Sequence, residues 1–320
     1  MTHLKAGVIG VGHLGQHHAR LYSSLPGVQL VGIVDQSADR AQLIADRHGV
    51  RVFRSIDDLL PHVDVISVAV PTSSHYAVAK ACLLAGKHVL VEKPIAVTSQ
   101  EGHELVRLAE EMRRCLQVGH SERFNPVMQV VRPYIRRPVF IEGHRLSSFS
   151  ERGTDVDVVL DLMVHDLDMV LSFNPGPVED IRAAGVPVLS STIDIANARI
   201  QFKSGCVANL TASRVSTNKM RRLRLFQPDS YLSIDFQSRQ GVIFRRMSGA
   251  GQRPTVEVEQ LQGSEEEPLK LQLESFLHSA STGTKPVVSG ADGAAALDVA
   301  QLVLQAIAAF VARQEQASVS

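Results

Sequence analysis

The sequence has no excess of charge of either sign. Lysine and arginine together number 33, aspartate and glutamate also number 33, and the formal net charge is zero. A neutral chain has no general electrostatic attraction for nucleic acid or for an anionic membrane. We therefore expect neither as a partner, although a local basic segment can still bind a small anion.

Cysteine is scarce, and neither cysteine nor histidine is arranged as a metal site. The three cysteines, Cys82, Cys115 and Cys206, are far apart and form no C-x-x-C pair, which fits neither a zinc site nor a disulfide framework. Such cysteines are typical of a reducing compartment, so we expect a cytoplasmic protein. The thirteen histidines are scattered, and the adjacent His17 and His18 would point apart on a helix. We expect no metal.

Long hydrophobic runs are also few. The N-terminus, MTHLKAGVIGVG, passes from a short apolar run straight into a glycine loop, which predicts no signal peptide. The most apolar late stretch, residues 293–312, is interrupted by Asp298, Gln301 and Gln305. This pattern favours a packed C-terminal helix over a membrane span.

The first 120 residues alternate between strand and helix patterns. Short apolar runs are separated by helical stretches, and both faces of such strands are covered in a parallel sheet. The runs are Leu4–Ile9, Val28–Val34, Asp64–Val70, His88–Val91 and Cys115–Val118. We therefore predict an α/β domain over residues 1–120, a doubly wound Rossmann sheet.

The pattern changes after Gly119. One long helical stretch, roughly Val156–Phe173, is followed by strand-like runs with turns between them, such as Ile195–Phe202 and Val207–Ser213. We predict a second, α+β domain over 121–320, with an open, mostly antiparallel sheet and helices. Its last helix is expected to pack back on the first domain. The polar segment Ser248–Glu267 is expected to form a mobile loop or an edge.

A glycine loop follows the first strand and opens the first helix. Gly10 allows a tight turn, Gly12 lets the backbone approach a pyrophosphate, and Gly15 lets the helix pack close to the strand. The helix N-terminus offers N–H groups to the anion. The predicted cofactor loop therefore comprises Gly10, Gly12, His13, Leu14 and Gly15. The alternative is a structural turn that binds no nucleotide.

An acidic residue lies at the end of the second strand. Asp35 stands 20 residues after Gly15, where a carboxylate accepts hydrogen bonds from the adenosine ribose. Its charge would repel a 2′-phosphate. No arginine directly follows Asp35 to bind such a phosphate, since the nearest one is Arg40, so NAD is favoured over NADP.

The order of several motifs resembles the glucose–fructose oxidoreductase/inositol dehydrogenase (Gfo/Idh/MocA) family. The resemblance covers essentially the whole chain. Besides the glycine loop, the matching residues are Pro71-Thr72 with His75, Glu92-Lys93-Pro94, Arg123-Phe124-Asn125-Pro126, Asp161-x-x-x-His165 and the closing Ser289-Gly290-Ala291-Asp292-Gly293. The resemblance implies an NAD-dependent sugar dehydrogenase whose open sheet often serves as an oligomer interface. We expect a homo-oligomer, a dimer or a tetramer.

The candidate catalytic residues are Lys93, His165 and Asp161. Lys93 ends a central strand, where ligands of open α/β sheets bind. Asp161 and His165 are four apart, so on an α-helix they share one face, and the carboxylate can orient the imidazole. The alternative is an ordinary amphipathic helix. The resemblance gives Lys93 and His165 the acid/base and substrate-oxygen roles, and which of them takes the proton stays open.

Further residues are expected to bind the cofactor or the substrate. Pro71, Thr72 and His75 are expected on the cofactor side, and Glu92 either binds the nicotinamide end or is structural. Expected substrate ligands are Arg123, Asn125 and Arg214.

The segment Arg214–Arg224 carries five cations and no acid. Such a segment can clamp a diphosphate, although a solvated hairpin is the alternative. The segment Gly119–Pro126 resembles family members that oxidise the 3-hydroxyl of UDP-N-acetylglucosamine. A nucleotide-activated amino sugar is therefore the expected substrate. The alternatives are an inositol or free-polyol dehydrogenase and an NAD-binding sensor without turnover.

Overall fold

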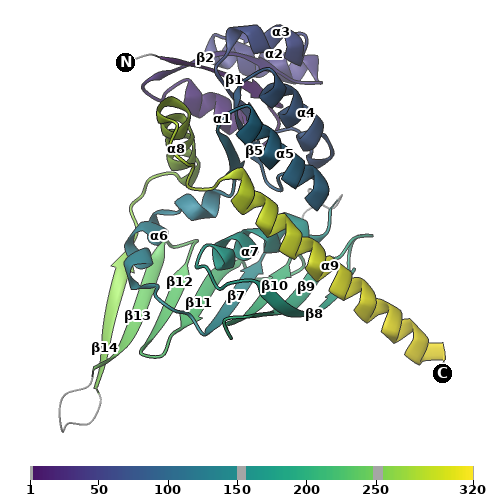
Figure 1. Ribbon diagram of the computed structural model, residues 1–320, viewed down its shortest axis with the longest axis vertical. Helices are drawn as coiled ribbons and strands as arrows, with labels where there is room; N and C mark the ends of the chain where they lie inside the picture. Colours follow the sequence, from purple (N-terminus) through teal and green to yellow (C-terminus); the bar gives the residue numbers. More distant parts are fainter. Residues whose placement is uncertain (1–2, 150–155, 248–254, 320) are drawn as a thin grey trace. The chain divides into compact units, whose positions relative to one another are not determined.

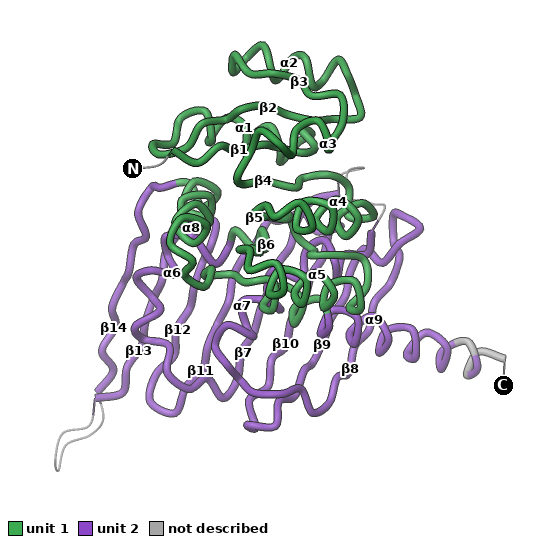
Figure 2. The backbone as a smooth tube through the Cα atoms, turned by 45° about the horizontal axis from the view of Figure 1, so that its top comes forward, with its two compact units in different colours: residues 1–121, 267–297 green, residues 122–266, 298–320 purple. Residues whose placement is uncertain are grey.

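A computed structural model describes residues 3–149, 156–247 and 255–319. The chain divides into two compact units (Figure 2). Unit 1 comprises residues 1–121 and 267–297, and unit 2 comprises residues 122–266 and 298–320. The first boundary lies one residue after the expected position. The return of residues 267–297 to unit 1 differs from the expected contiguous division, because a helix and the start of the last helix pack there.

Unit 1 contains a parallel six-stranded sheet. Its strand order is β3-β2-β1-β4-β5-β6, the order of a Rossmann sheet, which confirms the predicted fold class. The chain order reverses between β1 and β4, and ligands of such sheets bind at the carboxyl ends of the strands near this point. The strands are β1 Leu4–Ile9, β2 Val28–Val34, β3 Arg51–Val52, β4 Val65–Val68, β5 His88–Glu92 and β6 Leu116–Gly119.

Helices cover both faces of this sheet (Figure 1). On one face α1, α2 and α8 bury apolar side chains in a cluster with β1, β2, β4 and β5. The other face of β1 meets α3, since a Cβ added at Gly7 would lie 2.9 Å from Leu59. The helices are α1 Gly15–Tyr22, α2 Ala38–His48, α3 Ile56–Leu59, the 3-10 turn η1 Leu60–His62, α4 Thr72–Leu84, α5 Ser99–Glu111 and α8 Pro268–Thr282.

Local sequence signals explain where several of these helices begin and end. The Ser37 hydroxyl accepts a hydrogen bond from the N–H of Arg40 at the start of α2, and Gly49 ends the helix with φ of 65°. A reciprocal capping box between Thr98 and Glu101 opens α5.

Unit 2 is built on an eight-stranded sheet with the order β14-β13-β12-β11-β7-β10-β9-β8. Neighbouring strands are antiparallel except for β7 and β10. The mostly antiparallel sheet confirms the prediction. Its strands are β7 Phe140–Leu146, β8 Val178–Val186, β9 Ile195–Phe202, β10 Val207–Ser213, β11 Met220–Phe226, β12 Ser230–Asp235, β13 Gln240–Met247 and β14 Thr255–Gln262.

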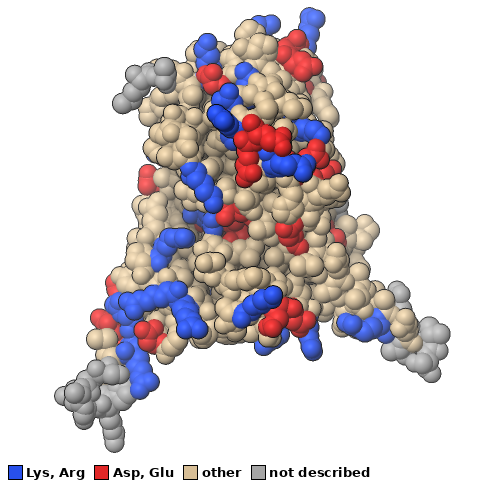
Figure 3. Space-filling model, viewed as in Figure 1, with Lys and Arg blue, Asp and Glu red and all other residues tan. Residues whose placement is uncertain are grey.

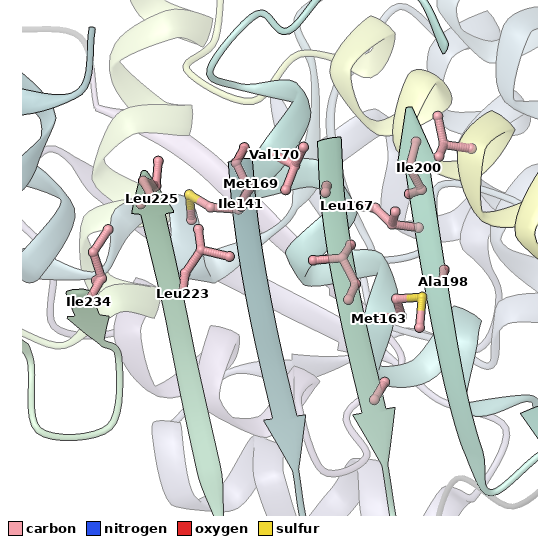
Figure 4. Packing of buried hydrophobic residues seen from close by; sticks show 14 of the residues in the cluster. Ile141, Met163, Leu167, Met169, Val170, Ala198, Ile200, Leu223, Leu225 and Ile234 are labelled. Atoms are coloured by element: carbon pink, nitrogen blue, oxygen red, sulfur yellow. The ribbon is translucent and has the colours of Figure 1, made fainter. Parts of the chain in front are cut away.

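One face of this sheet carries the core of unit 2 (Figure 4). Met163, Leu167 and Val170 pack onto alternate side chains of the strands, among them Ile141 and Leu223, and all five are almost completely buried. Burying each such side chain contributes about 1.5–3 kcal/mol. The helical segments of the unit are η2 Ser121–Phe124 at the boundary, α6 Pro126–Val131, η3 Arg132–Tyr134, the π-helical turn η4 Val159–Met163 and α7 Val164–Leu171.

The last helix, α9 Gly290–Val319, belongs to both units. Its first turns pack in unit 1, where a Cβ at Gly293 would lie 2.4 Å from Val118. Further along, Val303 and Ile307 join the core of unit 2. Among the described residues, α9 alone has the length and composition of a membrane span, because an 18-residue window within Gly290–Gln314 has a mean hydropathy of 1.9. Because its buried residues pack in both units, we interpret it as a core helix, as predicted.

One local prediction needs correction, and another is confirmed in part. The stretch 156–173 is not one α-helix, because a π-helical turn at Val159–Met163 precedes α7. Within the polar segment 248–267, residues 255–262 form the edge strand β14, which fits the expected edge. Residues 248–254 lie outside the described part of the chain.

Acidic and basic side chains are interspersed on the face shown in Figure 3. Many of them form surface ion pairs, such as Arg20 with Glu267 at 2.6 Å and Lys80 with Glu104 at 2.7 Å. This mixture agrees with the neutral composition.

Candidate functional site

The carboxyl ends of the strands in unit 1 bring the predicted cofactor residues to one edge of the sheet. The glycine loop follows β1, and two of its glycines are required by the packing of the protein itself. Gly10 has φ of 82°, and a Cβ there would lie 2.7 Å from the carbonyl oxygen of Ala69. A Cβ at Gly15 would lie 1.8 Å from the carbonyl oxygen of Gly10. Both glycines therefore let α1 begin directly against the strand.

Gly12 differs from the other two glycines. A Cβ at this position would meet nothing within 4 Å, and the residue does not have a positive φ. The protein itself therefore gives no steric reason for glycine at position 12. A ligand that approaches the backbone does give one, and the N–H groups of the first turn of α1 suit an anion. This open cradle fits the pyrophosphate of a dinucleotide.

Asp35 directly follows β2, and its carboxylate contacts the glycine loop. Its carboxylate accepts hydrogen bonds from the N–H of Val11 at 2.7 Å, from the N–H of Ser37 at 2.8 Å and from the guanidinium of Arg40 at 2.7 and 3.2 Å. Burial alone would raise the pKa of Asp35, but these hydrogen bonds outweigh it and lower the pKa below its ordinary value. The Asp35 side chain is 4% exposed and the Arg40 side chain 49%, so Arg40 has room to leave the carboxylate.

His75 lies at the end of β4, in the first turn of α4, because that helix begins at Thr72 just after Pro71. The imidazole is buried and lies between two carbonyl oxygens, that of Val70 at 2.9 Å and that of Pro94 at 2.7 Å. Burial lowers the pKa of His75, although the two hydrogen bonds oppose this effect. His75 thus joins the loops that follow β4 and β5, and its contact with a cofactor stays a prediction, as do those of Pro71 and Thr72.

Glu92 and Lys93 stand at the carboxyl end of β5. The Glu92 side chain is buried and lies 3.0 Å from Nε2 of His18, whereas Lys93 is half-buried and precedes Pro94 through a cis peptide bond. Sequence reasoning missed His18, which was weighed only as a metal ligand. Its position three residues after Gly15, on the helix that packs against the sheet, was the available signal.

In unit 2, Asp161 and His165 lie on either side of the junction between η4 and α7. Both side chains are partly exposed. The argument that they share one face assumed a regular α-helix, whereas the structure has a π-helical turn directly before α7. Such turns often occur at functional sites. The catalytic roles of Asp161 and His165 stay predictions.

A buried charge network lies next to His165, and sequence reasoning missed it. Asp166 of α7 contacts Arg145 of β7. Arg145 donates to both oxygens of Asp166 at 2.8–3.2 Å and to Glu122 at 3.0 Å, and its side chain is 5% exposed. Although burial opposes a charged guanidinium, the two carboxylates raise the pKa of Arg145 above its ordinary value. The network fixes α7 against β7 and η2.

The predicted substrate ligands Arg123 and Asn125 lie beside this network. Nε of Arg123 is 3.8 Å from a carboxylate oxygen of Asp168, which is buried. The amide of Asn125 caps α6 by accepting from the N–H of Val127 at 3.2 Å and donates to the carbonyl oxygen of Phe236 at 3.0 Å. Asn125 therefore has a structural task, and the substrate roles of both residues stay predictions.

Arg214 is buried at the end of β10. Its guanidinium donates to the carbonyl oxygens of Val156 at 2.5 Å and Ile193 at 3.2 Å, and it lies 3.5 Å from the carboxylate of Asp194. These partners hold the guanidinium inside the protein. The diphosphate role expected for Arg214 therefore stays a prediction, and it competes with a structural task.

The other cations of the segment 214–224 alternate along the chain into β11. Arg222 pairs with Asp235 at 3.1 Å and Arg224 with Glu142 at 2.9 Å. Arg221 faces the opposite side of the strand and lies 3.5 Å from Glu122, with 58% of its side chain exposed. The five charges therefore do not form one surface.

Within the part of the chain that the structure describes, no group of three or more His, Cys, Asp and Glu side chains is arranged to hold a metal ion.

Comparison with known proteins identifies the family. Residues 4–120 match the oxidoreductase family model with an NAD-binding Rossmann fold, and residues 132–228 match the GFO/IDH/MocA C-terminal domain. The UDP-N-acetylglucosamine 3-dehydrogenase of Acidithiobacillus ferrooxidans is 38% identical over 98% of this chain and 100% of its own length. Its structure has a TM-score of 0.91 and covers 97% of this chain and 99% of that one. The myo-inositol 2-dehydrogenase of Thermotoga maritima is 26% identical over 92% of this chain and 93% of its own. The chain therefore belongs to the GFO/IDH/MocA family of oxidoreductases.

Proposed function

We propose that this protein oxidises the 3-hydroxyl of a UDP-linked amino sugar, such as UDP-N-acetylglucosamine, with NAD as the hydride acceptor. The observation that carries the proposal is the similarity over nearly the whole length to a UDP-N-acetylglucosamine 3-dehydrogenase, at 38% identity. The similarity to the inositol dehydrogenase from T. maritima is lower, at 26%. The three buried or partly buried free cysteines suit the cytoplasm, where we expect the enzyme to act.

The residues of the chain divide the chemistry between them. NAD, when bound, would supply the acceptor for the hydride of the carbinol carbon. Lys93 and His165 handle the hydroxyl group, one holding its oxygen and the other taking its proton, and Asp161 orients His165. The product is the 3-keto sugar.

Asp35 supports NAD rather than NADP as the cofactor. Hydrogen bonds keep its pKa low, so the carboxylate is charged at neutral pH and repels a 2′-phosphate. It can accept hydrogen bonds from the ribose hydroxyls once the half-exposed Arg40 moves aside.

Among the cations near the predicted substrate residues, Arg221 is the better candidate for a diphosphate ligand. Its side chain is 58% exposed, whereas that of Arg214 is 5% exposed. An exposed guanidinium can bind phosphate oxygens without breaking internal hydrogen bonds. We expect Arg221→Ala to raise KM for the UDP-sugar and leave KM for a free polyol unchanged.

The experiment that tests the function combines calorimetry with turnover. The protein is titrated with UDP, UDP-N-acetylglucosamine and myo-inositol in the presence of NAD, and the absorbance of reduced nicotinamide is followed. UDP binding together with reduction of NAD by the UDP-sugar supports the proposal. Turnover of myo-inositol without UDP binding would assign the chain to the free-polyol branch instead.

A matched pair of variants separates an enzyme from an NAD-binding sensor. His165→Ala should abolish turnover while the affinity for NAD is preserved, whereas His278→Ala, at an exposed position of α8, should leave both unchanged. If His165→Ala left turnover intact, the catalytic role of this residue would be refuted.

We also propose that the exposed face of the eight-stranded sheet joins copies of this chain. The side chains of Phe140, Phe226, Tyr231 and Phe244 face one another in this order across four neighbouring strands, with ring centroids 4.9–5.5 Å apart, and Val258 of β14 continues the row. An apolar row of this kind is typical of an interaction surface. Light scattering should show a homo-oligomer for the native chain and a smaller species for Phe244→Arg.

A further inference from the structure

A chain of buried hydrogen bonds in unit 1 ends next to Lys93. The hydroxyl of Tyr22 lies 2.9 Å from that of Ser67, Oγ of Ser67 lies 3.0 Å from Nδ1 of His18, and Nε2 of His18 lies 3.0 Å from Oε1 of Glu92. Their exposures are 1%, 0%, 0% and 7%. Buried polar groups destabilise a fold unless they are hydrogen-bonded, and a fully connected network is rigid.

The fold brings these four side chains together in a simple way. His18 and Tyr22 are four residues apart on α1 and therefore lie on one face of the helix. Ser67 lies within β4 and Glu92 ends the neighbouring strand β5. Leu90, two residues before Glu92, belongs to the apolar cluster covered by α1, so strand alternation directs Glu92 to the same side.

The donors and acceptors of the chain can be assigned from one end to the other. Burial strongly raises the pKa of Tyr22, so its hydroxyl stays protonated and donates to Ser67. The Ser67 hydroxyl then donates to Nδ1 of His18, and the Nε2–H of His18 donates to Glu92. This direction uses each proton once and requires Glu92 to accept as a carboxylate.

The charges around Glu92 favour its ionised form. Burial alone would raise its pKa, but the hydrogen bond from His18, together with the charge of Lys93, lowers the pKa below its ordinary value. Lys93 follows Glu92 directly after the end of β5, and His75 belongs to α4. On the neighbouring strand β6, Glu92 is paired with Gly119, where a Cβ would lie 2.6 Å from Oε1 of Glu92. His18 and the Gly119 backbone thus confine the carboxylate.

The network has the connectivity of a serine–histidine–carboxylate triad, but its geometry excludes hydrolysis. Ser67 lies inside a central strand and is 0% exposed, so its hydroxyl cannot reach a substrate. Of the four hydrogen-bonded side chains, Glu92 is the one at the carboxyl edge of the sheet. Any functional effect of the network is therefore exerted through Glu92.

We propose that His18 is a positioning residue of the dehydrogenase, which fixes Glu92 as a carboxylate immediately before Lys93. The proposal rests on the proposed function, in which Lys93 handles the substrate hydroxyl. The charge of Glu92 interacts with that of Lys93, and we infer that this attraction holds the Lys93 side chain toward the substrate oxygen. Tyr22 and Ser67 hold His18 in the tautomer that this task needs.

The first test measures Glu92 directly in the protein without substrate. Infrared spectra recorded over a range of pH report the protonated carboxyl group of Glu92, identified by its absence in Glu92→Gln. In His18→Leu, burial is no longer opposed by a donor, so the pKa of Glu92 rises and the band appears at higher pH than in the native protein. In His18→Gln, the amide can still donate, and the band should stay close to its native position.

The second test uses turnover. His18→Leu should lower kcat by about 10- to 100-fold, the range known for residues that orient a functional side chain. The acid limb of its kcat/KM profile should move to higher pH. Glu92→Gln should lower kcat without this shift, and the double variant should be no worse than Glu92→Gln alone, because His18 acts through Glu92. The exposed His103 of α5 provides the matched control, His103→Leu, which should behave like the native protein.

Several outcomes would overturn the proposal. One is an unchanged titration of Glu92 in His18→Leu, and another is a uniform loss of activity at every pH, which indicates a purely structural histidine. If His18→Leu fails to fold, Ser67→Ala removes the donor to Nδ1 of His18 and the acceptor of the Tyr22 hydroxyl but keeps the imidazole, and it should shift the titration in the same direction by a smaller amount. Absence of any turnover with UDP-N-acetylglucosamine would refute the proposed function, while the infrared titration would still decide the role of His18.

Discussion

Replacing Asp35 with serine should change the cofactor preference, because two effects act in the same direction. The substitution removes a charged carboxylate, and it releases the guanidinium of Arg40, which donates to that carboxylate at 2.7 and 3.2 Å. A 2′-phosphate with two charges about 5 Å from the carboxylate is repelled by roughly 3 kcal/mol at an effective dielectric constant of about 40. Allowing for screening by salt, the ratio of the Kd values for NADP and NAD should fall by about 30- to 100-fold.

The assay is a calorimetric titration of both cofactors at two salt concentrations. Asp39→Ser, at an exposed position in the first turn of α2, provides the matched control and should leave the ratio unchanged. In the Asp35→Ser background, Arg40→Ala should reverse part of the gain in NADP affinity. An unchanged ratio for Asp35→Ser would refute the role of this carboxylate. A gain that survives Arg40→Ala in full would refute the role of the released guanidinium.

Three further predictions follow from the packing. Gly12→Val should lower NAD affinity at least about tenfold in calorimetry. Thermal unfolding should show little change in stability, because a Cβ at position 12 meets open space in the protein itself. A loss of stability similar to that of Gly15→Ala would contradict this. Arg145→Met leaves Asp166 without its guanidinium and should cost about 3–5 kcal/mol in urea unfolding. Because burial raises the pKa of Asp166, protonation removes the uncompensated charge as pH falls, so this cost should shrink in acid; a constant cost would argue against an electrostatic origin. Phe244→Arg should yield a smaller species than the native chain in light scattering, and an unchanged mass would remove this face as the interface.

The common location of the predicted cofactor residues could be anticipated from the sequence because they follow strands of a parallel sheet. The carboxyl ends of neighbouring strands meet at one edge, so residues that follow the apolar runs must gather there whatever the details of packing. This places the loop at Gly10, Asp35 and Lys93 on that edge. The hydrogen-bond partner of Asp35 was harder to predict, because the hydrogen bond from Arg40 depends on the first turn of α2.

The buried networks were not predictable to the same extent, because their members are distant in sequence. Arg145 and Glu122 are 23 residues apart, and their contact depends on how β7 lies against η2. His18 and Glu92 are 74 residues apart. Ser67 in the apolar run of β4 was a local signal, since a hydroxyl inside a buried strand requires a partner. That signal indicates that a polar partner exists, but the identity of the partner depends on which helix covers the strand.

The basic segment shows why clustering in sequence does not by itself create a charged patch. On a strand, successive side chains point to opposite faces, so Arg221 and Arg222 cannot bind one diphosphate together from the same face. The two arginines therefore pair with different carboxylates, Arg221 with Glu122 and Arg222 with Asp235. If this segment binds a nucleotide-sugar diphosphate, Arg221 must therefore act together with groups that lie outside its own face of β11. Loss of Arg221 should accordingly weaken UDP binding more than loss of Arg222 does.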